Sequence, residues 1–192
     1  LDAENNYNLE SSIEVAKELE KLEYTWFEAP LPDYDFEGYK KITDSVEIKI
    51  IPSGNWVVDL QRFSEAIKNK IWSATRTDMA MIGGITNGKK AMDLSAAGGL
   101  NCEIMSWGYT LVSVANLHLM LSSNNCSYYE QPLPYETFEF GMDDVLRTNK
   151  DGYMHAPTKP GLGMKVNWDQ MKTKVIHSFI CDKNKKKGHV HA

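Results

Sequence analysis

Three oxygen-bearing side chains stand where successive apolar stretches of the sequence end. Asp2 closes the short opening stretch, Glu28 closes EYTWFE, and Asn55 follows EIKIIP at the end of the turn PSGN. Two carboxylates and one amide carbonyl suit a hard divalent cation, and Mg²⁺ accepts such ligands alongside water and substrate oxygens. Singly, each residue is better explained as a cap, a solvated strand end or a turn residue. In register on consecutive strands, the three together predict a Mg²⁺ site.

Two more carboxylates close later apolar stretches. Asp78 ends SATRTD, where it could orient a base or cap a helix. Glu130 ends NCSYYE, where it could be a general acid or a buried structural carboxylate. The pair Gly83–Gly84 after Asp78 is compatible with a phosphate-binding turn or with an ordinary tight turn. Asp78 and Glu130 are therefore candidate catalytic residues, and residue type alone leaves their roles open.

The elements that must position these residues alternate between apolar runs and helical periodicity. Strands are expected at residues 23–28, 47–52, 73–79, 100–106 and 125–130. Helices are expected at residues 9–22, 35–42, 59–69, 86–98 and 110–122. Asp59 and Thr86 are predicted helix N-caps, and Gly98–Gly99 is a predicted helix stop.

This alternation predicts βαβ units and a parallel sheet. The strand ends recur about every 25 residues, as successive units of a (β/α)₈ TIM-type barrel do, and barrel active sites lie at the C-terminal strand ends. A doubly wound sheet also alternates, but it does not aim all its strand ends at one place. Only six strand ends are found between Asp2 and Glu130. We therefore expect an incomplete barrel, or part of a longer protein.

Composition narrows the class of protein. The chain has 192 residues, of which 42% are hydrophobic and 24% charged, with a net charge of -5. The negative net charge argues against a nucleic-acid partner, and no apolar run is long enough for a membrane span.

The cysteines, Cys102, Cys126 and Cys181, show neither a disulfide nor a zinc pattern, so reduced thiols in a cytoplasmic protein are expected. Residues 1–135 are expected to form barrel units, residues 136–180 a turn-rich segment packed on them, and residues 181–192 a basic, poorly ordered tail.

Seven segments between residue 2 and about residue 168 follow one another in a recognisable order: LDAENNYN, WFEAPLP, PSGN, DMAMIGGIT, SWGYT…NLHLML, YYEQPLP and PGLGMKV. In this order they resemble the mandelate racemase/muconate lactonizing enzyme family of the enolase superfamily. The resemblance implies that the chain supplies barrel strands 3 to 8, without the first two strands and the capping domain that precede them in the family. It also implies a homo-oligomer.

The same resemblance implies Mg²⁺-assisted removal of a proton alpha to a carboxylate, through an enediolate that the metal stabilises. Asp2 and Glu28 resemble the first two metal ligands. Asn55 stands where most members have glutamate; glucarate-type dehydratases resemble this chain in having asparagine there. Asp78 resembles the aspartate of a His-Asp dyad. Glu130 resembles the last-strand carboxylate that hydrogen-bonds a substrate carboxylate. Dehydration of an acid sugar is the expected reaction; racemisation and cycloisomerisation are the alternatives.

Two departures from the family pattern qualify this expectation. Met105 stands at the position of the dyad histidine, and a thioether cannot take a proton. His118, in the predicted helix 110–122, is expected to be a packing residue. The lysine base that the family carries on its second strand has no counterpart in the sequence. A truncated, non-catalytic barrel that binds another chain through unpaired strand edges is therefore a further alternative.

Overall fold

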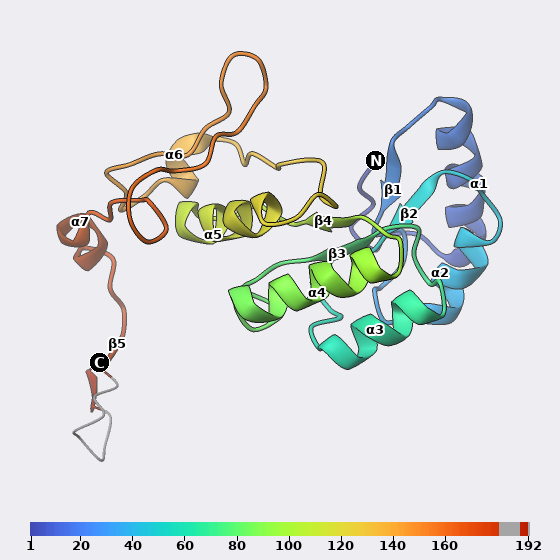
Figure 1. Ribbon diagram of the computed structural model, residues 1–192, viewed down its shortest axis with the longest axis horizontal. Coiled ribbons are helices and arrows are strands. Elements are labelled where there is room, and N and C mark those ends of the chain that lie inside the picture. The colour runs from blue at the N-terminus through green and yellow to red at the C-terminus, as the bar shows by residue number, and fades with distance from the viewer. Residues whose placement is uncertain (181–188, 192) are drawn as a thin grey trace.

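The computed structural model describes residues 1–180 and 189–191, and Figure 1 shows its elements in order. Strands and helices alternate through α1 (Leu9–Lys21), β1 (Trp26–Glu28), α2 (Phe36–Thr43), β2 (Lys49–Ile51), α3 (Leu60–Lys68), β3 (Thr75–Thr77), α4 (Ile85–Ala97), β4 (Cys102–Ile104) and α5 (Thr110–Leu121). After these come α6 (Tyr135–Phe138), α7 (Trp168–Lys172), β5 (Ser178–Ile180) and β6 (His189–His191). The five long helices match their predicted positions to within a residue or two.

Strands β1 to β4 lie side by side in chain order, and the strand pairs β1–β2 and β3–β4 are parallel. Asp2 forms a parallel bridge with Glu28, which places the opening segment beside β1. The Ser73 N–H donates to the Ile50 carbonyl at 2.9 Å and joins β2 to the segment that leads into β3. The carboxyl ends of these strands therefore meet along one edge, as the alternating pattern predicts.

The expected strand at 125–130 is not formed, although this segment does lie beside β4. The Cys102 N–H donates to the Asn125 carbonyl at 2.7 Å. Further contacts use side chains, because the Ile104 N–H points to Cys126 Sγ at 3.4 Å and the Ser127 N–H to Glu103 Oε2 at 2.9 Å. Side-chain acceptors replace the backbone ladder, which explains why the segment is irregular.

The helix ends test the predicted caps. Asp59 is confirmed as the N-cap of α3, with its side chain accepting from the Arg62 N–H. Thr86 is wrong as a cap: α4 begins at Ile85, after Gly84, without a side-chain cap. Gly84 has a φ of 104°, a conformation open to glycine, so the backbone itself turns into the helix one residue earlier. The predicted stop is confirmed, since Gly98 is the C-cap of α4.

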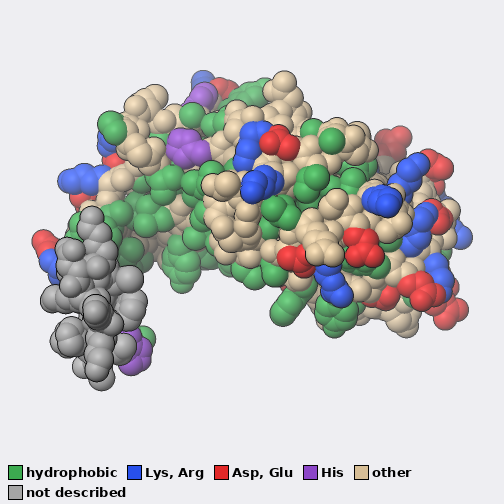
Figure 2. Space-filling view, turned by 60° about the horizontal axis from the view of Figure 1, so that its bottom comes forward, with side chains coloured by type: hydrophobic (Ala, Val, Ile, Leu, Met, Phe, Trp, Pro, Cys, Tyr) green, Lys and Arg blue, Asp and Glu red, His purple; other side chains and the backbone are tan. Residues whose placement is uncertain are grey.

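The core lies between the strands and the helices that follow them. Its largest fully buried side chains include Phe27 and Ile50 from the strands and Tyr39, Ile42 and Phe63 from the helices. On the outer face, charged side chains of both signs are interspersed over the N-terminal helices (Figure 2). Several form exposed i,i+3 or i,i+4 pairs such as Lys21–Glu18. Such pairs are worth about 0.3–0.5 kcal/mol each, so the buried face carries the stability.

The turn-rich segment after the last unit packs on α5. Leu146 joins Val114 and Leu117 in a second apolar cluster, and His118 Nε2 lies 3.2 Å from the Leu162 carbonyl. A basic, poorly ordered tail is expected at residues 181–192. Within it, β6 pairs antiparallel with β5. Residues 181–188 and 192 lie outside the described residues. The alternating sequence His-Val-His suits such a strand. Within the described ranges, no helix has both the length and the apolar character that crossing a membrane requires.

Candidate functional site

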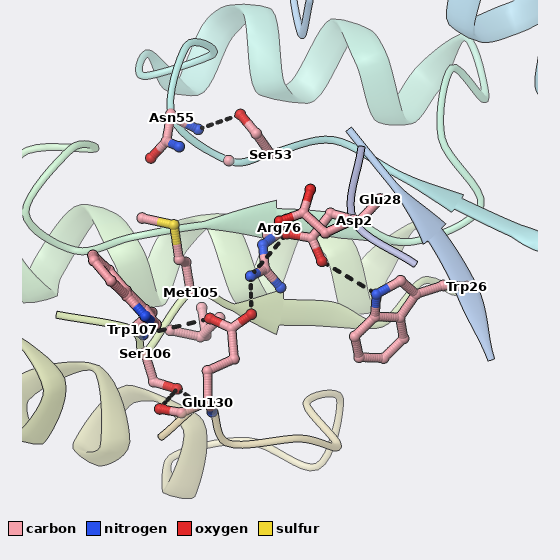
Figure 3. Close-up of polar contacts among 12 residues, drawn as sticks. Asp2, Trp26, Glu28, Ser53, Asn55, Arg76, Met105, Ser106, Trp107 and Glu130 are labelled. Atoms are coloured by element: carbon pink, nitrogen blue, oxygen red, sulfur yellow. Dashed lines mark hydrogen bonds and ion pairs between the residues drawn. The ribbon is translucent and has the colours of Figure 1, made fainter. Parts of the chain in front are cut away.

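A cavity of about 430 Å³ opens where the strand ends meet (Figure 3). It is lined by residues from the opening segment, from strands β1 and β3, from the loops after β2 and β4, and from the irregular segment 125–130: Asp2, Glu4, Glu28, Ser53, Asn55, Arg76, Met105, Trp107 and Glu130. The structure therefore brings together four of the five site residues expected from the sequence. Asp78, the fifth, lies outside this lining.

The first two predicted metal ligands are held by the backbone of adjacent strands. The Glu28 N–H donates to the Leu1 carbonyl at 2.8 Å, and the Ala3 N–H donates to the Glu28 carbonyl at 2.9 Å. The Glu28 side chain is buried and accepts a hydrogen bond from Trp26 Nε1 at 3.2 Å. Asp2 Oδ1 accepts from the Glu4 N–H at 3.1 Å. Both carboxylates thus reach the cavity from a rigid pair of segments.

Arg76, in the middle of β3, is a cavity residue that the sequence reasoning missed. Its side chain is only 3% exposed, and Nη2 lies 3.1 Å from Glu28 Oε1. The same nitrogen contacts Glu130 Oε1, so one guanidinium bridges two of the carboxylates. The available signal was a cation in the middle of a predicted strand whose other charge, Asp78, lies at its end, since an arginine is almost never fully buried unless it is paired.

The cavity carries an excess of negative charge. Four carboxylates, those of Asp2, Glu4, Glu28 and Glu130, face the single guanidinium of Arg76. Burial raises the pKa of Glu28 to about 7; Arg76 opposes this, and Asp2 and Glu130 reinforce it. The pKa of Glu4 is also raised, chiefly by the charge of Asp2.

The excess of negative charge in the cavity, together with the oxygen donors of Asp2, Glu28 and Asn55, fits a divalent cation. Two carboxylates and an amide carbonyl are hard oxygen donors, and a cation beside them would offset the repulsion between the carboxylates. In residues 1–180, no group of three or more His, Cys, Asp or Glu side chains is arranged to hold a metal ion. That finding is compatible with the predicted set, because its third member is Asn55, an amide.

Glu130 is fixed by the turn that follows β4. Its backbone N–H donates to Ser106 Oγ at 2.6 Å, and the Trp107 N–H points to Glu130 Oε2 at 3.4 Å. The Trp107 ring stacks edge-on against Phe138, with the ring centroids 4.9 Å apart. The turn-rich segment therefore supports the wall of the cavity on the Glu130 side.

Asp78 lies behind the cavity rather than in it. Its carboxylate accepts from Asn116 Nδ2 at 2.8 Å and from the Ala80 N–H at 2.9 Å. The same Asn116 amide donates to the Met105 carbonyl at 2.9 Å. Asn116 therefore links the Asp78 carboxylate to the backbone of Met105.

A parallel α/β arrangement with its polar residues gathered at the strand ends is the architecture of TIM-barrel-type domains. The family model described as "Enolase C-terminal domain-like" matches residues 1–170, and the chain belongs to this family. The resemblance to the enolase superfamily is therefore confirmed.

Solved structures and curated relatives agree with this assignment. A putative mandelate racemase/muconate lactonizing enzyme from Pseudovibrio sp. is 36% identical with a TM-score of 0.90, over 99% of this chain and 48% of that one. D-glucarate dehydratase from Agrobacterium tumefaciens, complexed with magnesium, is 28% identical with a TM-score of 0.80, over 90% of this chain and 45% of that one. D-galactonate dehydratase family member RspA from Pantoea ananatis is 29% identical over 86% of this chain and 40% of its own length. The chain thus spans less than half the length of these proteins.

Proposed function

We propose that this chain forms the barrel portion of an enzyme that uses Mg²⁺ to remove a proton alpha to a carboxylate, and that the reaction is the dehydration of an acid sugar. The observation that carries the proposal is the meeting of Asp2, Glu28 and Asn55 in one cavity with Glu130. Relatives named as D-galactonate family, arabinonate and D-xylonate dehydratases support the choice of reaction.

A homo-oligomer is also part of the proposal, and light scattering of the purified protein tests this oligomeric state.

In this proposal Asp2, Glu28 and Asn55 hold the metal. When bound, Mg²⁺ would supply the positive charge that favours loss of a proton next to a carboxylate. The neutral amide of Asn55 leaves one negative charge fewer around the site than a glutamate would, which reduces repulsion of an anionic substrate. Arg76 adds a fixed positive charge at the cavity wall, and Glu130 lies where it can hydrogen-bond the substrate.

Met105 favours dehydration over racemisation. Racemisation needs a proton acceptor on each face of the substrate, and the thioether of Met105 cannot accept a proton. Dehydration needs one abstracted proton and an acid that assists the departing hydroxide. Among residues 1–180, neither lysine nor histidine lines the cavity; the lysine base that the family resemblance implies would have to come from the part of the relatives' length that the chain does not match.

The test uses the protein expressed from its complete natural reading frame. Calorimetric titration should show Mg²⁺ binding, and incubation with a panel of aldonates and hexarates in D₂O should yield a 2-keto-3-deoxy acid. Deuterium entry at the alpha carbon without keto-acid formation would instead favour the racemase alternative. Absence of both products over the panel, together with absence of Mg²⁺ binding, would favour the non-catalytic barrel.

A further inference from the structure

Asp33 is a fully buried carboxylate that binds the loop carrying Asn55. It lies in the turn after β1, at 0% exposure. Its oxygens accept from the Ser53 N–H at 2.7 Å, Ser53 Oγ at 2.8 Å, the Gly54 N–H at 3.1 Å and the Trp56 N–H at 3.3 Å. All four donors belong to the loop after β2.

Asn55 is tied to the same carboxylate through one hydroxyl. The Asn55 N–H donates to Ser53 Oγ at 3.2 Å, and this hydroxyl in turn donates to Asp33. Each residue from 53 to 56 is thus bound to Asp33, directly or through Ser53. Asn55 itself lines the cavity, and Figure 3 shows its backbone bound to Ser53.

The loop is also supported on its other flanks. The turn that carries Asp33 is held by Tyr39, whose hydroxyl donates to the Leu31 carbonyl at 2.7 Å in the buried interior. On the opposite side, Gly54 approaches β3 so closely that an added Cβ would lie 3.0 Å from Arg76 Cγ and 3.2 Å from the Thr77 nitrogen. The turn after β1 and strand β3 therefore hold the loop from two sides.

Burying a carboxylate is costly unless hydrogen bonds compensate for the lost water, and four donors do so here. An ordinary turn does not need such an anion, because its N–H groups can be solvated or bound by neutral acceptors. The bonds instead join the turn after β1 to the loop after β2; Glu28 is the last residue of β1, directly before that turn, and Asn55 lies in the loop. We propose that Asp33 is a positioning residue for the metal site, which sets the Asn55 amide against the Glu28 carboxylate. This inference rests on the proposed Mg²⁺ site.

The experiment compares Asp33→Asn with Asp35→Asn by calorimetric Mg²⁺ titration of the complete protein. Asp35 is the matched control: it is two residues away and caps α2 by accepting from the Gly38 N–H, a role that asparagine fills equally well. Loss of an outer-shell partner of a metal ligand typically costs 10–100-fold in affinity, so the Kd of Asp33→Asn should rise roughly tenfold or more. The Kd of Asp35→Asn should match that of the wild type.

A double-mutant cycle separates positioning from general destabilisation. If Asp33 acts through Asn55, Asp33→Asn should change the Kd little in an Asn55→Ala background. A purely structural role would lower the melting temperature of Asp33→Asn but leave the Kd of the folded protein unchanged, and that result would overturn the inference. Equal loss of affinity in both backgrounds would overturn it as well.

Two further outcomes are distinguishable. If the wild type itself binds no Mg²⁺, the proposed function fails and the inference falls with it. If Asp33→Asn does not fold, Ser53→Ala replaces it, because this change removes one bond to Asp33 and the acceptor of the Asn55 N–H while keeping the backbone bonds. A Kd at least threefold weaker in Ser53→Ala supports the inference, and an unchanged Kd contradicts it.

Discussion

Arg76 Nη2 lies 3.1 Å from Glu28 Oε1, and the two side chains, from β3 and β1, are 3% and 10% exposed. Strand β2 lies between β1 and β3, so the ion pair reaches across β2 from one neighbouring strand to the other. Burial alone lowers the pKa of Arg76, but Glu130 and Glu28 more than offset this and raise it. The guanidinium therefore stays charged and is the internal counter-ion of the cavity.

Replacing Arg76 with methionine should destabilise the metal-free protein. The change leaves the buried Glu28 and the partly buried Glu130 without a cation, and loss of one partner from a buried pair typically costs about 3–5 kcal/mol. Urea unfolding in EDTA measures the effect. The control is Lys21→Met, which removes the exposed pair with Glu18 and should cost about 1 kcal/mol or less. Equal losses in the two variants would show that the buried pair has no special role.

The metal-free protein should lose stability as the pH rises from about 4.5 to about 7. Burial raises the pKa of Glu28 from 4.5 to about 7 in the folded state, so the folded protein retains a proton that the unfolded chain has released. At 1.36 kcal/mol per pKa unit, the loss is at most roughly 3 kcal/mol. Glu28→Gln should remove this pH dependence.

Unfolding curves of wild type and Glu28→Gln in EDTA at pH 5 and pH 8 test this expectation. The control is Glu18→Gln, on the exposed face of α1, which should retain the slope of the wild type. A slope in Glu28→Gln as steep as that of the wild type would assign the pH dependence to other groups.

Gly54→Ala should destabilise the protein more than Gly99→Ala does. Both glycines have positive φ, 81° and 73°, so alanine is strained at either position by roughly 1–2 kcal/mol. At Gly54 the new methyl group also meets Arg76 and Thr77, whereas at Gly99 it meets nothing within 4 Å. Denaturant unfolding of both variants gives the comparison. A smaller loss at Gly54 would mean that the loop after β2 moves away from β3 readily.

Asp78→Asn tests whether Asp78 acts by holding the wall behind the cavity. The asparagine cannot accept as strongly from the Asn116 amide, so the free energy of unfolding should fall by about 1–3 kcal/mol. Because Asp78 lies outside the cavity lining, the Kd for Mg²⁺ should stay within about twofold of the wild-type value. Calorimetry and urea unfolding on the same preparation supply both numbers. A large change in Kd with unchanged stability would argue for a direct part in the site.

The order of elements was predictable because helix and strand periodicities are local properties of the sequence. The meeting of Asp2, Glu28, Asn55 and Glu130 was predictable because parallel strands end on the same edge. The Arg76 bridge was not, since it depends on which side chains face each other across the interior. The irregular course of 125–130 was missed for a similar reason: Glu103 and Cys126 offer side-chain partners that replace a strand ladder.

The distance along the chain between Arg76 and its two partners has a consequence for synthesis. Glu28 leaves the ribosome before Arg76, whereas Glu130 is 54 residues later. At translation rates of 5–20 residues per second, Arg76 has only its first partner for roughly 3 to 10 s. During that interval Asp2, Glu4 and Glu28 have already been made, so three of the four cavity carboxylates face the one guanidinium of Arg76. The surplus of negative charge therefore exists before Glu130 is made, and all three residues of the proposed cation site, Asp2, Glu28 and Asn55, leave the ribosome before Arg76.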